Sequence, residues 1–157
     1  MSFVVVGVVA GVLGTLTMDL LNLLLARAGM ISRIDVAMIG RMAGGWAGGR
    51  FRYGHASEMK HLTNEMLYGY VTHYVIGVSL ALPYVLGWAL LVGGPASPPW
   101  AVAYGVSTTA ASWFLVFPSM GFGMLGRRSP EGLKASLSSL ANHSFYGVGM
   151  AVGIALA

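Results

Sequence analysis

The sequence of 157 residues contains no cysteine and few charged residues. Without cysteine, these residues can form no disulfide, no thiolate nucleophile and no cysteine-ligated cluster. Charged residues make up 9% of the chain, against roughly 25% in ordinary soluble domains, whereas hydrophobic residues make up 56%. This composition excludes an ordinary soluble domain and indicates an integral membrane protein.

Four apolar windows are long enough to cross a bilayer, since a spanning helix needs about 20 mostly apolar residues. They cover residues 3–26, 68–92, 100–122 and 137–157. The sequence therefore predicts an all-α fold, a single integral membrane domain over residues 1–157 built as a four-transmembrane-helix bundle. A long loop over about residues 29–67 joins the first two helices.

The basic residues are confined to two of the connections between these windows. Six lie between the first and second windows and three lie between the third and fourth, whereas the connection "GGPASPPW" has none. The positive-inside rule then predicts a multi-pass protein with both charged loops in the cytoplasm and both termini outside. The isoelectric point near 9.7 is explained by basic loops that face the anionic lipid bilayer, and we expect no nucleic-acid partner.

The first charged loop carries a helix signature. Ser32 precedes Asp35 by three residues, which is typical of a helix start. An apolar face follows at Ile34, Ala37, Met38 and Met42. We expect a short amphipathic helix on the membrane surface. The glycine-rich segment 44–49 after it predicts a flexible cover that could move over an opening.

An internal echo suggests a repeat. The stretch "HYVIGVSLA" at 73–81 shares His, Gly and Ala with "HSFYGVGMA" at 143–151, and "GVLGT" at 11–15 resembles "GVSTT" at 105–109. This pattern predicts a two-helix internal repeat whose copies are related by an axis along the membrane normal. The second and fourth helices would then be diagonal neighbours, with His73 and His143 facing each other across the core.

Three ionisable residues are expected at one depth in the membrane. At about 1.5 Å per residue, Asp19 lies roughly 12 Å from Arg27, and His73 and His143 lie at comparable depths from the same side. Asp19 continues a stripe of small residues, which places it at a helix interface rather than towards lipid. The stripe consists of Gly7, Gly11 and Thr15. The flanking polar residues on the same layer are Asn22, Tyr70, Asn142 and Tyr146.

Several stretches resemble a known family. "GTLTMDLLNLL", "GRFRY", "HYVIGVSLAL" and "SFYGVGM" are similar to the marks of an uncharacterised bacterial family of small four-helix inner-membrane proteins, a domain of unknown function. The resemblance covers nearly the whole chain. It implies the four-helix fold and a location in the bacterial inner (cytoplasmic) membrane, and it implies no activity.

Three functions are compatible with the polar layer. A carboxylate beside two imidazoles has the composition of a proton relay, so the layer favours proton-linked passage of an ion or small solute. Alternatively, His73 and His143 could bind haem b for electron transfer, with Gly77 and Gly147 leaving room for the macrocycle. The two histidines and Asp19 could also bind a metal ion. In the third interpretation, the layer only holds helices together in an accessory or structural subunit.

The sequence carries no recognisable enzyme motif, so no catalytic residue is assigned. The small-residue stripes offer faces on which helices can approach closely. They lead us to expect a homo-oligomer, most simply a dimer, or a place in a larger membrane complex.

Overall fold

The computed structural model describes all 157 residues and contains helices and no strand. The long helices are α1 (Phe3–Arg27), α2 (Val36–Ala47), α3 (Glu65–Leu91), α4 (Pro98–Ser107) and α7 (Leu133–Leu156). Between α4 and α7 lie α5 (Thr109–Ala111), a π-helix η2 (Ser112–Val116) and α6 (Phe117–Ser119). Two 3₁₀ turns are η1 (Ala56–Glu58) and η3 (Met124–Gly126). The predicted all-α class is confirmed.

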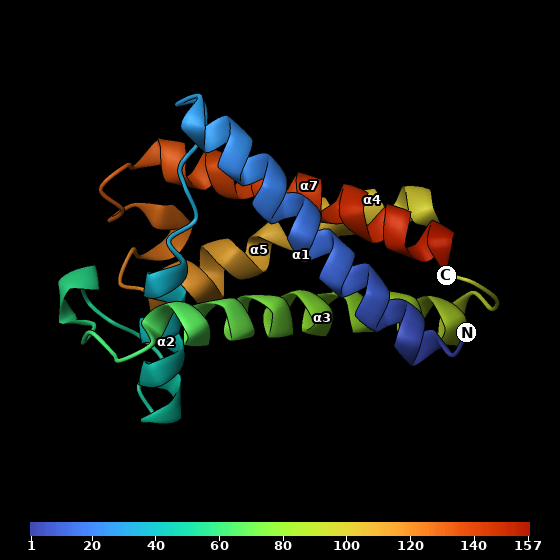
Figure 1. Cartoon of the computed structure of the whole chain (residues 1–157), viewed down its shortest axis with the longest axis horizontal. Helices are drawn as coiled ribbons and strands as arrows, with labels where there is room; N and C mark the ends of the chain where they lie inside the picture. The colour runs from blue at the N-terminus through green and yellow to red at the C-terminus, as the bar shows by residue number, and fades with distance from the viewer.

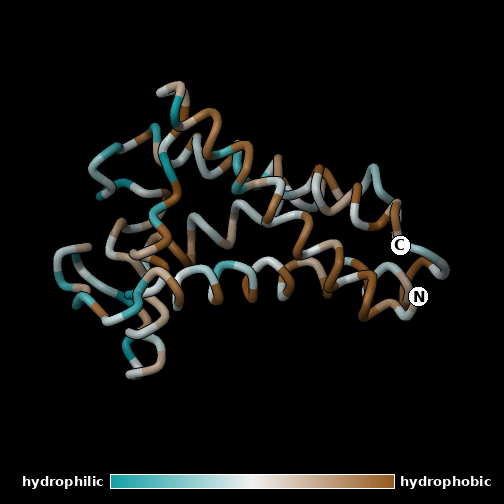
Figure 2. Tube along the Cα trace, viewed as in Figure 1, coloured by the Kyte–Doolittle hydropathy of each residue, from teal (hydrophilic) through white to brown (hydrophobic).

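Three stretches of helix are long and apolar enough to cross a membrane: Phe3–Arg27, Glu65–Leu91 and Pro98–Ser119. The third is the predicted window 100–122, which the structure divides into α4, α5, η2 and α6. The fourth predicted span is α7, with 24 residues, and its first half is rich in serine. Figure 2 shows apolar residues along the helices and hydrophilic residues gathered at one end of the molecule.

The long helices form a bundle around α1 and α7. Helix α1 packs against α3 on one side and α7 on the other, and α7 packs against α4. Helices α3 and α4 meet through tyrosine side chains, because the Tyr84 and Tyr104 rings lie 5.0 Å apart and the Tyr104 hydroxyl donates to the Leu80 carbonyl at 2.8 Å. Tyr146 of α7 reaches the diagonal helix α3, where its hydroxyl donates to the Gly77 carbonyl at 2.6 Å.

The connections divide between the two ends of the bundle. Figure 1 shows both termini and the turn between α3 and α4 at one end, and the α1–α3 and α6–α7 connections at the other. All nine basic residues lie at this second end, which we call the basic end.

Small residues allow the helices to touch in the half of the bundle near the termini. A Cβ on Gly11 of α1 would lie 2.5 Å from the Val78 Cα of α3, and one on Gly149 of α7 would lie 2.5 Å from the Leu13 carbonyl. Gly105 of α4 similarly contacts the backbone of Gly147. This packing supports the predicted small-residue stripe on α1. The repeat itself stays a prediction.

The first charged loop differs from its predicted form at two points. Helix α2 begins at Asp35, whose carboxylate accepts from the Met38 amide at 3.0 Å, and not at Ser32. The predicted flexible segment 44–49 is wrong in its first part, because α2 continues through Gly44 and Gly45 to Ala47. Gly40 of α2 lies against the Glu65 backbone of α3, and this contact fixes α2 to the start of α3.

Candidate functional site

Asp19 and His73 form a hydrogen-bonded pair between α1 and α3. His73 Nε2 lies 2.9 Å from Asp19 Oδ1, and the two side chains are 11% and 22% exposed, respectively. The small-residue contacts between α1 and α3 bring the helices close enough for this pair, since Thr15 packs against Gly77 one turn away. The expected convergence of Asp19 with one histidine is therefore present.

His143 has a different partner. Its Nδ1 lies 2.7 Å from the Thr108 hydroxyl, which lies 2.6 Å from the Gly105 carbonyl. A carbonyl can only accept, so the single hydroxyl hydrogen belongs to that bond and His143 Nδ1 must be the donor to Thr108. When His143 is neutral, this network requires the Nδ1–H tautomer and leaves Nε2 as an acceptor. His73 and His143 do not hydrogen-bond to each other.

Asn22 and Asn142 join the helices to a segment that we call the strap, residues 31–35. The Asn22 amide nitrogen donates to the Ser32 carbonyl at 2.9 Å and to Asn142 Oδ1 at 3.0 Å, and its oxygen accepts from the Ile34 amide at 3.1 Å. The Ser138 hydroxyl accepts from the Ser32 amide at 2.7 Å. The strap is therefore bound to both α1 and α7.

Two cavities lie beside the strap. The first, which we call the α1–α3 groove, has a volume of about 500 Å³. It is lined by residues of α1, the strap and α3, including Asp19, Asn22, Arg33, Asp35 and Tyr70. The second, which we call the central cavity, has a volume of about 420 Å³ and lies between α1, the strap, α3, η2, α6 and α7. Asp19 lines the groove and His73 lines the central cavity, so the hydrogen-bonded pair connects the two spaces.

The central cavity is lined by both polar and apolar residues. The polar residues include His73, Ser112, Ser138, Ser139 and Asn142. The apolar residues include Met18, Ile39, Val116, Phe117, Met120 and Phe122. A cavity of a few hundred Å³ with both kinds of lining is typical of a small-molecule site.

Sequence reasoning missed the serines of this cavity. Ser138, Ser139 and Asn142 lie at i, i+1 and i+4 of α7, which places them on one face of a helix. That stripe was visible in the sequence "SLSSLANHS". Ser112, by contrast, reaches the cavity from a π-helix, an element that often marks functional sites and that has no clear sequence signal here.

The other predicted site residues lie in helix packing or at the surface. Tyr146 is 1% exposed and packs over Gly14 of α1 while it donates to Gly77. Tyr70 is exposed and borders the α1–α3 groove.

The glycines expected to make room for haem do not fit that role. Gly77 packs against Thr15, and a Cβ on Gly147 would lie 2.8 Å from the Val102 carbonyl. Neighbouring helices thus fill the space beside both glycines, and no macrocycle can enter there. Asp19, His73 and His143 also do not form a group suited to a metal ion.

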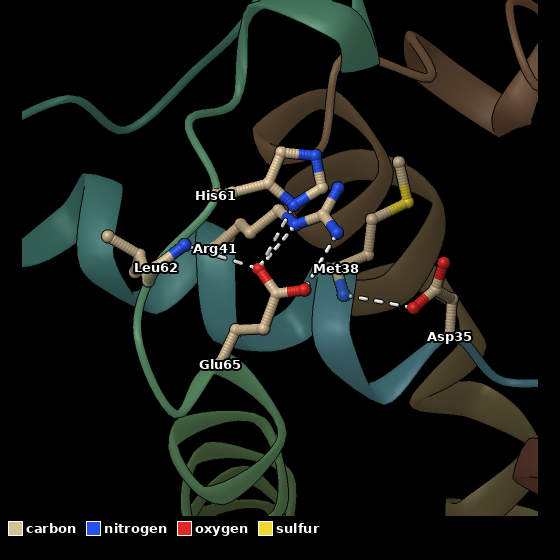
Figure 3. Close-up of polar contacts among 6 residues, drawn as sticks. All are labelled: Asp35, Met38, Arg41, His61, Leu62 and Glu65. Carbon is tan, nitrogen blue, oxygen red and sulfur yellow. Dashed lines mark hydrogen bonds and ion pairs between the residues drawn. The ribbon is translucent and has the colours of Figure 1, made fainter.

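An ion pair holds the start of α3 against α2. Figure 3 shows Arg41 of α2 and Glu65 of α3 in a two-pronged contact, with Nε–Oε2 and Nη2–Oε1 both at 2.8 Å. The hydrogen bond to Glu65 raises the pKa of the Arg41 guanidinium above its ordinary value, against an opposing effect of desolvation. His61 Nδ1 lies 3.6 Å from the same carboxylate. This contact fixes the base of the strap, because α2 follows it directly.

Residues 8–157 match the family described as Protein of unknown function (DUF2938). The chain belongs to this family. Membership in DUF2938 confirms the expected resemblance to an uncharacterised family, and its description assigns no activity. No curated protein and no solved structure matches the chain. The function of this DUF2938 member therefore has to be argued from the Asp19–His73 pair and the cavities that it connects.

Proposed function

We propose that the protein mediates proton-linked passage of a small solute across a membrane, with Asp19 and His73 as the proton-handling pair. One observation carries the proposal: the two paired side chains line different cavities. A proton taken up at His73 Nδ1 from the central cavity can release the Nε2 proton to Asp19 and so to the α1–α3 groove. A pair needed only for helix packing would not require a cavity on either side.

The chemistry of the pair suits this role. An ionised carboxylate only accepts hydrogen bonds, so His73 donates Nε2–H to Asp19 and its Nδ1 remains free for a second proton. Histidine gains and loses a proton near neutral pH in ordinary surroundings. The proton is then held as an imidazolium beside a carboxylate, and no unpaired charge remains inside the membrane.

The remaining polar residues serve the same site under this proposal. Asn22 holds the strap beside the central cavity, and Asn142 accepts a hydrogen bond from Asn22. His143 offers an acceptor at Nε2 after donating to Thr108. Transport further requires the packed half of the bundle near the termini to open, so the structure corresponds to a state that is accessible from the basic end.

We also propose that the basic end faces the cytoplasm of a bacterial inner membrane, as the positive-inside rule requires. The chain has no native cysteine, so Ser57→Cys in the basic connection and Ser2→Cys near the N-terminus give two clean labelling sites, both exposed. An impermeant thiol reagent on intact cells should label only Ser2→Cys. Labelling of the Ser57→Cys variant alone would show the opposite orientation and contradict this proposal. The small residues of α1, α3 and α7 pack against one another within the bundle, so a homodimer would use another face. The homodimer stays a prediction, and a monomeric mass in native membranes would contradict it.

The test of passage is a proton flux in liposomes. Purified protein is reconstituted with an internal pH dye, and solutes of anionic, cationic and neutral classes are added outside. We expect at least one class to drive a pH change, and Asp19→Asn and His73→Gln to abolish it. The matched control is His61→Gln, because the His61 side chain is 80% exposed and lies outside both cavities. Flux that survives Asp19→Asn, or no flux with any class, would overturn the proposal.

A further inference from the structure

The hydrogen-bonding groups left free in the central cavity indicate what it can bind. Asn142 Oδ1 accepts from Asn22, and its Nδ2 has no protein partner, so two N–H donors are available in a residue that lines the cavity. Ser139 and Ser112 bond to each other at 2.9 Å, and the pair retains one free hydroxyl hydrogen. The Ser138 hydroxyl is fully engaged by Lys134 and Ser32. The asparagine and serines that line the cavity therefore offer mainly donors to a ligand.

His73 supplies the complementary group. With Nε2–H donated to Asp19, a neutral His73 presents Nδ1 as an acceptor, and a protonated His73 presents it as a donor. The charged and titratable groups around it are Asp19 on α1, Tyr74 on α3, His143 on α7, and Arg33, Asp35 and Glu131 beside the cavity. The elements α5, η2 and α6 contribute no charged or titratable group to the lining of the cavity.

The charges at the mouth argue against a free anion. Arg33, Asp35 and Glu131 are all exposed, and together they carry a net negative charge. Asp35 caps α2, and Glu131 accepts from the Ser32 hydroxyl. An anion is therefore acceptable only if a proton enters with it. The same cavity is also lined by two phenylalanines and several methionines, and these side chains favour a ligand with an apolar part.

We propose that the central cavity binds a small monocarboxylic acid with an apolar tail, taken up as a carboxylate together with one proton. The proposal rests on the proton-linked function and names its substrate class. One carboxylate oxygen accepts from Asn142 Nδ2 and the other shares the proton with His73 Nδ1. No covalent bond changes, and the ligand and its proton add no net charge to the cavity. The tail lies against Val116, Phe117 and Phe122.

Equilibrium binding tests the ligand class independently of transport. Hexanoate, hexanamide, hexylamine and acetate are titrated into the full-length protein in detergent by calorimetry, in buffers of different ionisation enthalpy so that proton uptake is counted. We expect hexanoate to bind with uptake of about one proton. Acetate should bind at least about tenfold more weakly than hexanoate, because it lacks the methylenes that the apolar lining residues would bury.

Two variants connect the binding to named residues. Asn142→Asp keeps the acceptor for Asn22 but replaces the amide donors with a negative oxygen, so hexanoate affinity should fall by about tenfold or more. The matched control is Asn64→Asp, because the Asn64 side chain makes no capping hydrogen bond and lies outside both cavities. This variant should leave the affinity for hexanoate unchanged. His73→Gln should remove the proton uptake. Phe122→Ala should reduce the difference in affinity between hexanoate and acetate.

The outcomes separate this inference from the proposed function. Hexanoate binding with proton uptake but without flux in liposomes would support the ligand class and refute passage. Flux driven by another solute, with no hexanoate binding, would refute the ligand class and leave passage standing. Stronger binding of hexylamine or hexanamide than of hexanoate would also overturn the inference, as would an Asn142→Asp protein that binds hexanoate like the wild type.

Discussion

Replacement of Asn22 by leucine should release the strap without unfolding the bundle. The two side chains have similar size, so packing is largely retained, but three hydrogen bonds of 2.9, 3.0 and 3.1 Å are lost. Hydrogen bonds between helices in membranes contribute about 0.6 kcal/mol on average, and those in soluble proteins about 1 kcal/mol. Two of these bonds, to Ser32 and from Ile34, hold the strap, and together they contribute about 1–2 kcal/mol, which corresponds to a roughly 5- to 30-fold rise in strap opening.

Native-state proteolysis measures this opening directly. Trypsin cleaves after arginine, and Arg33 is an exposed residue of the strap. When opening and closing are fast relative to cleavage, the cleavage rate follows the population of the open form. Mass spectrometry of the fragment that ends at Arg33 should show the expected acceleration for Asn22→Leu. As a control, Asn64→Gly changes an asparagine without side-chain hydrogen bonds whose φ of 62° glycine tolerates. A rise of less than about threefold would refute the role of Asn22.

Two further expectations concern the framework that positions the pair. Gly11→Ala should lower the free energy of unfolding by about 1–3 kcal/mol, since its Cβ would lie 2.5 Å from the backbone of α3. Gly87→Ala, whose Cβ would have no atom within 4 Å, should leave the free energy of unfolding unchanged or raise it by up to about 1 kcal/mol. Unfolding in mixed micelles compares the two variants. Arg41→Lys keeps the charge but cannot reproduce the two-pronged contact with Glu65, so it should cost about 1 kcal/mol and increase hydrogen exchange at the start of α3. Equal stability of the two alanine variants, or unchanged exchange in Arg41→Lys, would contradict these roles.

Local patterns predicted the helices because each pattern acts within one segment. The length of the apolar runs predicted the long helices, and the small-residue spacing on α1 predicted that Asp19 lies at a helix interface. The structure shows that the neighbouring helix is α3, where Asp19 meets His73. The serine stripe of α7 was also readable, since one helical face collects residues at i, i+1 and i+4. The prediction of a flexible segment was wrong at Gly44 and Gly45 because both residues belong to α2. This helix is held against α3 by the close contact of Gly40, and that packing outweighs the flexibility of isolated glycines.

The rest of the site depends on contacts between distant parts of the chain. The strap reaches Asn22 and Ser138 across 10–12 and 106 residues, respectively, and Asn22 reaches Asn142 across 120. No periodicity encodes such contacts. The partner of His143 was missed for a related reason, because Thr108 is placed by the interruption between α4 and α5 and not by a regular helix.

The position of Tyr146 determines where any passage must open. Its ring fills the space over Gly14 of α1, and its hydroxyl reaches Gly77 of α3, one helical turn from His73 towards the termini. Beyond it, the backbones of α1, α3, α4 and α7 touch through glycines, and the buried side chains are apolar. Under the proposed function, a polar route from the basic end would therefore stop at Tyr146. A solute that leaves the central cavity towards the termini must displace this ring and break its hydrogen bond to Gly77, so Tyr146 is the barrier that the Asp19–His73 pair would have to control.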